Sequence, residues 1–221
     1  MADMPYSLSA YRNWSGKFVW PRLTLPGLCH ACGQWAWQAL CPACAGLGHA
    51  ATGDSASSCV AAKLYVSPWK ELITAFKFEG QVGLAYFLAQ QMRQTPAIAQ
   101  RLDDCEWVVP VPLSAQRLRE RGFNQALQLA KQLCPERTLG HALIRLRDTP
   151  AQSGLSRQDR LVNLQHAFMV NPNCLPSLRD SRVVVLDDVT TTGTTLLACT
   201  QALQVARVKQ VDAVVLARTP A

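Results

Sequence analysis

The stretch "RVVVLDDVTTTGTT", residues 182–195, decides what fold this chain is expected to have. Three valines and a leucine in a row are typical of a strand buried inside a sheet. The predicted strand, 182–188, ends in two adjacent carboxylates, Asp187 and Asp188, and a threonine-rich segment around Gly193 follows it. In open α/β sheets, ligands bind beyond the carboxyl ends of the strands, where the next helix presents unpaired N–H groups. The stretch therefore predicts a ligand site at the edge of a sheet.

The threonine segment has the composition of a phosphate-binding loop. Its hydroxyls and backbone N–H groups can surround a phosphate, and glycine permits a tight turn. The candidate residues are Thr190, Thr191, Thr192, Gly193, Thr194 and Thr195. The segment contains no lysine and lacks the glycine spacing of a Walker P-loop, which disfavours ATP or GTP hydrolysis.

The two carboxylates need a role of their own, because they would repel a phosphate beside them. They can accept hydrogen bonds from vicinal sugar hydroxyls, or help to hold a divalent cation that the ligand brings. A ribose 5-phosphate unit has vicinal hydroxyls at one end and a phosphate at the other. Such a unit fits the spacing of the acids and the threonines.

The rest of the chain alternates between apolar runs and helical patterns. Strands are expected near 60–66, 105–112, 138–149, 166–170 and 210–219, and helices near 68–78, 83–94, 124–134 and 194–208. Continuous apolar runs that alternate with helices indicate a mostly parallel sheet covered on both faces. The predicted fold class is therefore doubly wound α/β.

Composition and charge narrow the class of protein. The 221 residues are 49% hydrophobic and 17% charged, as in ordinary folded proteins, and 22 basic against 15 acidic residues give a net charge of +7. That charge favours a polyanionic partner, although mild basicity without a specific role is the alternative. The sequence has no apolar run long enough to span a bilayer and no secretory signal, so we expect a cytoplasmic protein without membrane insertion.

Four of the nine cysteines form two CxxC pairs, Cys29-x2-Cys32 and Cys41-x2-Cys44. This spacing predicts a structural Zn²⁺ site of four thiolates. Rubredoxin-like iron, a redox-active CxxC pair and free thiols remain alternatives. A Gly/Ala/Ser-rich stretch follows, and we expect a lead-in and finger over 1–55 and a main domain over 56–221.

A basic loop is expected after the strand near 105–112. It carries Arg117, Arg119 and Arg121, and Asn124 is a plausible N-cap for the next helix. Guanidinium groups suit phosphate oxygens, while a solvated basic surface is the alternative.

Residues 183–195 resemble the thirteen-residue signature of type I phosphoribosyltransferases. The resemblance implies that family's fold and a ligand, phosphoribosyl pyrophosphate, bound together with Mg²⁺. It assigns the ribose hydroxyls and the catalytic position to Asp187 and Asp188, and the 5-phosphate to the loop 190–195. It also implies a pyrophosphate-binding role for Arg117 and Arg121, with Lys77 at the end of a helix as a further candidate.

Three longer stretches, "LITAFKFEGQVGLA", "VPLSAQRLRERGFNQA" and "RxxDTPAQSxLxxxxRxxNxxxAF", together with the cysteine pairs, resemble the ComF/GntX family. This resemblance implies a link to competence and DNA utilisation, with single-stranded DNA and DNA-uptake proteins as partners, and it also implies a four-cysteine finger. The predicted activity is phosphoribosyl transfer to an unassigned acceptor. The alternative is a non-catalytic factor that binds single-stranded DNA through its finger and basic surface.

Overall fold

A four-stranded parallel sheet forms the centre of the computed structural model, which describes residues 11–12, 18–19, 27–29, 32, 34–36, 39–47, 59–146 and 167–220. The strand order is β5-β10-β9-β6, and each neighbouring pair runs parallel. The strands are β5 (Cys59–Leu64), β6 (Trp107–Pro110), β9 (Arg182–Thr190) and β10 (Gln210–Arg218). The predicted parallel sheet is confirmed.

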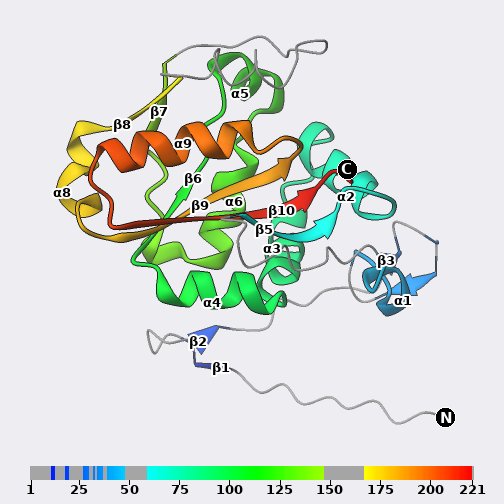
Figure 1. Ribbon diagram of the computed structural model, residues 1–221. Coiled ribbons are helices and arrows are strands. Elements are labelled where there is room, and N and C mark those ends of the chain that lie inside the picture. Colours follow the sequence, from blue (N-terminus) through cyan, green and yellow to red (C-terminus); the bar gives the residue numbers. More distant parts are fainter. Residues whose placement is uncertain are drawn as a thin grey trace.

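Helices cover both faces of this sheet (Figure 1). On one face α9 packs against β9 and β10, and on the other α3, α4 and α6 pack against the strands. Their bounds are α3 (Leu84–Arg93), α4 (Pro96–Asp104), α6 (Gln125–Leu133) and α9 (Thr194–Val205), and α2 (Trp69–Phe78) packs against α3. None of the described helices is both long enough and apolar enough to cross a membrane.

Shorter elements lie outside the central sheet. The helical ones are α1 (Pro42–Ala45), α5 (Ala115–Arg121), η1 (Pro135–Arg137), η2 (Pro172–Cys174) and α8 (Leu175–Leu178). The paired strands are β1 (Tyr11–Arg12) with β2 (Phe18–Val19), β3 (Gly27–Leu28) with β4 (Trp35–Ala36), and β7 (Leu143–Arg145) with β8 (Phe168–Val170). Within the stretches expected as strands near 138–149 and 166–170, Thr138 forms an isolated parallel bridge to Val108 of the central sheet, and β7 and β8 thus pair with each other. Their middle residues, Ile144 and Met169, are exposed, as one face of an antiparallel ribbon can be.

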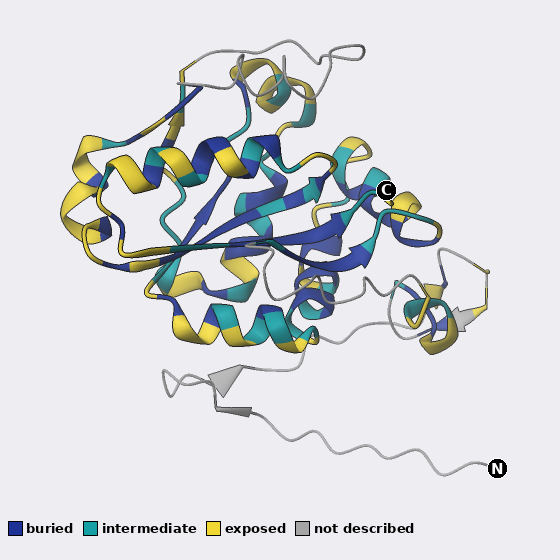
Figure 2. Ribbon diagram, viewed as in Figure 1, coloured by how far each residue is buried: buried dark blue, intermediate teal, exposed yellow. Residues whose placement is uncertain are grey.

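The decisive strand, β9, is longer than the sequence suggested. It runs through both aspartates to Thr190, because β10 stays paired with it as far as Arg218. Alternate residues of β9 enter two buried clusters: Val184 faces the side of α3 and α6, and Val185 faces α9. Figure 2 shows the strands buried between helices whose outer surfaces are exposed.

The cysteine-rich segment packs onto the main domain. Trp69 is fully buried, and its Nε1 donates a hydrogen bond to the Leu47 carbonyl at 2.6 Å. Lys63 lies 4.5 Å above the Trp69 ring, and its Nζ donates to the Ala45 carbonyl at 3.4 Å. Burial lowers the pKa of Lys63 to about 8. Because Leu40 belongs to the same buried cluster as α2 and α3, this segment shares the core of the main domain.

We predict that Trp69→Phe will lower the free energy of unfolding by about 1–3 kcal/mol. The Leu47 carbonyl loses its buried hydrogen-bond donor, and the smaller ring leaves a cavity in the core. Trp107→Phe is the matched control. Its Nε1 also donates to a backbone carbonyl, that of Ser177 at 2.8 Å; the side chain is partly buried, but this hydrogen bond is exposed, so water can replace it. Urea unfolding followed by circular dichroism measures the free energy of unfolding of both variants. Equal decreases in the two variants would contradict a special contribution of the buried Trp69 hydrogen bond.

Candidate functional site

Asp188 lies at the carboxyl end of β9 in a buried ion pair. Lys77, in the last turn of α2, places its Nζ 3.0 Å from Asp188 Oδ1. The side chains are only 12% and 9% exposed, so solvent screens the pair weakly. A second bond, from the backbone N–H of Val189 to Asp188 Oδ1 at 2.5 Å, holds the carboxylate in place. The candidate lysine and one candidate acid are thus brought together.

Asp187 occupies the other face of the sheet, because successive strand residues alternate. Its charge contributes to the raised pKa of Cys199 in α9, which burial raises most. Burial, and then the charge of Asp188, raise the pKa of Asp187 itself to about 7, while the Asp188 N–H, Lys77 and Arg121 oppose the rise. The backbone N–H of Asp188 donates to Asp187 Oδ1 at 2.8 Å. The two acids therefore straddle the sheet at one edge and differ in environment.

The threonine segment joins β9 to α9. Thr190 ends the strand, residues 191–193 form the loop, and α9 begins at Thr194. Gly193 has φ +76°, a left-handed conformation that favours glycine, and its carbonyl accepts from Leu197 N–H at 2.9 Å. The hydroxyls of Thr192 and Thr194 hydrogen-bond to each other. The first N–H groups of α9 have no carbonyl one turn earlier in their helix, which makes this end suitable for an anion.

A cavity of about 360 Å³ opens beside this loop. Its lining comprises Cys59, Thr190, Thr191, Thr192, Gly193, Leu196, Leu197, Thr200, Ala213 and Arg218. Arg218, at the end of β10, brings a positive charge to the cavity, and its Nη2 donates to the Cys59 carbonyl at 3.1 Å. The sequence interpretation did not include Arg218, although its place at the end of a strand parallel to β9 could have indicated it.

The basic segment forms a short helix, α5, where the sequence predicted a loop. Ser114 caps it, since its Oγ accepts from Arg117 N–H at 3.2 Å, and Gly122 ends it at φ +75°. In a helix Arg117 and Arg121 share a face, whereas Arg119 points to the other side. The helix therefore presents the two pyrophosphate candidates, Arg117 and Arg121, on one face and Arg119 on another. Asn124 caps α6 as predicted, with Oδ1 accepting from Leu127 N–H at 3.2 Å.

Arg121 is tied to the acid pair through a chain of contacts. Its guanidinium carbon lies 5.0 Å from the ring centre of Phe78, the residue after Lys77. Its Nη1 donates to Gln125 Oε1 at 3.0 Å. Arg121 and Lys77 together therefore supply positive charge next to Asp187 and Asp188.

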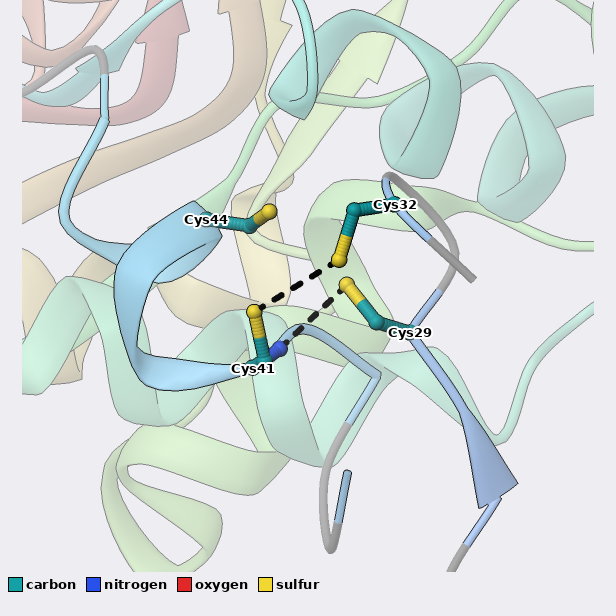
Figure 3. Close-up of side chains that lie close together, drawn as sticks. All are labelled: Cys29, Cys32, Cys41 and Cys44. Atoms are coloured by element: carbon teal, nitrogen blue, oxygen red, sulfur yellow. Dashed lines mark hydrogen bonds between the residues drawn. The ribbon is translucent and has the colours of Figure 1, made fainter. Parts of the chain in front are cut away.

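The four cysteines of the two CxxC pairs gather in space (Figure 3). Their sulfur atoms all lie within 4.8 Å of one another, and Cys32 Sγ is 3.8 Å from Cys41 Sγ. Tetrahedral zinc with Zn–S bonds of about 2.3 Å places its sulfurs about 3.8 Å apart. The backbone N–H of Cys41 also donates to Cys29 Sγ at 3.3 Å. Hydrogen bonding to Cys41 and then burial raise the pKa of Cys44 to about 12, so four thiolates need a cation among them. The cluster could hold a metal such as zinc.

Comparison with known proteins agrees with the fold and with the quoted motifs. The protein-family model named phosphoribosyl transferase domain matches residues 82–221 of this sequence. The chain belongs to the phosphoribosyl transferase domain family. It is 35% identical to Competence protein F of Haemophilus influenzae over 70% of this chain and 69% of that protein. This similarity, together with those to Competence protein ComFC and to the DNA utilization protein YhgH given below, confirms the predicted membership of the ComF family.

Two further relatives carry related names. The chain is 35% identical to Competence protein ComFC of Bacillus subtilis, over 60% of this chain and 52% of that protein. It is 32% identical to the DNA utilization protein YhgH of Salmonella typhimurium, over 80% of this chain and 84% of that protein. The ComF stretch with the consensus "RxxDTPAQSxL" falls mostly in 147–166, outside the described residues.

We predict that the purified chain carries about one zinc ion and that Cys32→Ser loses it. Cys32 is exposed, so its replacement removes a ligand with little change to the core. Loss of metal should lower the melting temperature by several degrees, because the segment that it orders packs on Trp69. Mass spectrometry of metal content and calorimetry measure both effects. Cys59→Ala, outside the cluster, should retain the ion, and full metal content in Cys32→Ser would refute the assignment.

Proposed function

We propose that this chain binds phosphoribosyl pyrophosphate with Mg²⁺ and transfers its phosphoribosyl group. One observation carries the proposal: a threonine loop, two acids and two cations from separate elements meet at one edge of the parallel sheet. Such a ligand has a phosphate, a pair of ribose hydroxyls and a pyrophosphate, and each type of polar group at this edge suits one of them.

The 5-phosphate suits the loop between β9 and α9. Backbone N–H groups at the start of α9 and the hydroxyls of Thr191 and Thr192 can donate to its oxygens. Arg218 adds a positive charge from the neighbouring strand. In this proposal residues 190–195 bind the phosphate together, and the cavity beside them accommodates it.

The ribose hydroxyls suit the acids at the end of β9. A carboxylate accepts hydrogen bonds only, so ionised Asp187 and Asp188 can each receive a hydroxyl. Lys77 already compensates the charge of Asp188, and we propose that its ammonium also contacts the pyrophosphate once the ligand binds. Arg121, with Arg117 on the same face of α5, would bind the remaining pyrophosphate oxygens.

The carboxylates also fit the hard oxygen donors that Mg²⁺ prefers. When bound with the ligand, this ion would neutralise charge on the departing pyrophosphate. In the transfer, the acceptor forms a bond to ribose C1, the C1–O bond to pyrophosphate breaks, and pyrophosphate leaves with the electron pair. The chain's own residues would orient the 5-phosphate and pyrophosphate ends of the ligand and stabilise the charge on the leaving pyrophosphate, without a covalent nucleophile.

The relatives' names extend this proposal to a cellular role. They are called competence and DNA utilization proteins, and we propose that this chain likewise acts in the use of DNA taken up by the cell. The net charge of +7 is consistent with a polyanionic partner such as single-stranded DNA. DNA therefore belongs among the acceptors and partners tested.

The direct test is titration calorimetry with phosphoribosyl pyrophosphate in the presence and absence of Mg²⁺. We expect Mg²⁺-dependent binding that weakens at least tenfold in Asp188→Asn, which removes a charged acceptor. Asp212→Asn is the control, because Asp212 is a partly buried acid of β10 that pairs with Arg101 at 3.7 Å. Pyrophosphate release with bases, nucleosides and single-stranded DNA then identifies the acceptor. Absence of binding, or equal binding by both variants, would reject the proposal.

The raised pKa of Asp187 predicts how this affinity depends on pH. The free protein holds Asp187 largely protonated below about pH 7, whereas the ribose hydroxyls need the ionised form. Affinity should therefore rise with pH by up to about tenfold per unit below pH 7 and level off above it. The ligand's own phosphates also titrate near pH 6, so Asp187→Asn must be titrated in parallel. The same pH dependence in Asp187→Asn and in the unaltered chain would contradict this role.

A further inference from the structure

Gln125 has a buried amide with one polar atom unused. It is the first residue of α6, and its side chain is fully buried. Its Oε1 accepts from Arg121 Nη1 at 3.0 Å. Because a guanidinium only donates, this bond fixes which end of the amide is oxygen and leaves Nε2 as a donor. Among the described residues, none accepts a hydrogen bond from Nε2.

The position of this amide relates it to the proposed ligand site. α6 follows β6 and packs against β9, so its first residue lies toward the carboxyl edge that holds the acids. Through Arg121 the amide joins the chain of contacts that continues over Phe78 to Lys77 and Asp188. Nε2 belongs to the same planar group as the oxygen that contacts Arg121, and it therefore lies beside that guanidinium.

The charges around Nε2 select the chemical class of its missing partner. The group must accept a hydrogen bond, and it would lie close to the Arg121 guanidinium. An anionic oxygen gains from this cation, whereas a neutral carbonyl or hydroxyl gains little. Phosphate and pyrophosphate oxygens meet these conditions, and a carboxylate side chain of the protein would have to leave its present partner to do so.

We propose that Gln125 contacts the pyrophosphate end of the ligand: its Nε2 donates to a pyrophosphate oxygen, while its Oε1 holds Arg121 toward the same group. This inference rests on the proposed function and adds a residue that no motif had assigned to the site. The proposed contact also explains why the chain keeps a buried donor without a partner. Such a donor lowers the free energy of unfolding of the ligand-free protein, and functional sites often retain groups of this kind.

The variant Gln125→Met tests the proposal, because methionine has nearly the same length and no polar hydrogen. We expect the melting temperature to stay the same or rise, since an unsatisfied buried donor is removed. Affinity for Mg²⁺-pyrophosphate should fall at least tenfold, and affinity for ribose 5-phosphate should not change. Gln132→Met, at an exposed position of the same helix, should leave both affinities as they are. A lower melting temperature with unchanged pyrophosphate affinity would show a purely structural role and overturn the proposal.

A double-mutant cycle with Arg121→Met separates the donor from the positioning of the arginine. If Nε2 contacts pyrophosphate, Gln125→Met weakens binding further in the Arg121→Met background. No further loss in that background would overturn the proposed contact. Failure of the unaltered chain to bind either phosphoribosyl pyrophosphate or Mg²⁺-pyrophosphate would reject the proposed function, and this inference with it. Binding by the unaltered chain that Gln125→Met leaves intact rejects this inference alone.

Discussion

The ion pair between Lys77 and Asp188 is the interaction on which the geometry of this edge depends. Asp188 is buried and Asp187 is partly buried, so the two adjacent carboxylates repel each other with little screening, and Lys77 compensates the charge of Asp188. Lys77 comes from α2, which begins at Trp69, and Trp69 in turn contacts the cysteine-rich segment. A single helix of ten residues therefore links the four-cysteine cluster at one end to the acid pair at the other.

The polar groups at this edge already bind one another in the structure. Lys77 pairs with Asp188, Arg121 with Gln125, and the hydroxyls of Thr192 and Thr194 with each other. These contacts hold donors and acceptors in fixed positions at little conformational cost to a ligand that replaces some of them. Burial and the charge of Asp188, and not these contacts, raise the pKa of Asp187 to about 7, which limits the number of unpaired charges before binding.

Much of the fold and part of the site could be predicted from the sequence because their signals are local. The valine run of β9, the glycine at 193, the Asn124 cap and the CxxC spacing each depend on neighbours in the chain. The sequence did not predict Arg218, whose contact with Cys59 joins strands distant in sequence. It also did not predict Gln125, whose partner Arg121 is one helical turn away but whose burial depends on how α6 packs in the fold. It also misjudged the segment after β6, because the helix between Ser114 and Gly122 depends on its two caps and not on an apolar period.

The central claim is that the threonine loop, the acids and the cations bind one phosphoribosyl ligand together. Amide hydrogen exchange with and without Mg²⁺ and phosphoribosyl pyrophosphate tests it most directly, because exchange reports each segment separately. We expect slower exchange in 188–196 and in 121–127 at the same ligand concentration, with α4 (Pro96–Asp104) unchanged. Slower exchange in only one of the two segments, or in α4 alone, would contradict a single shared site.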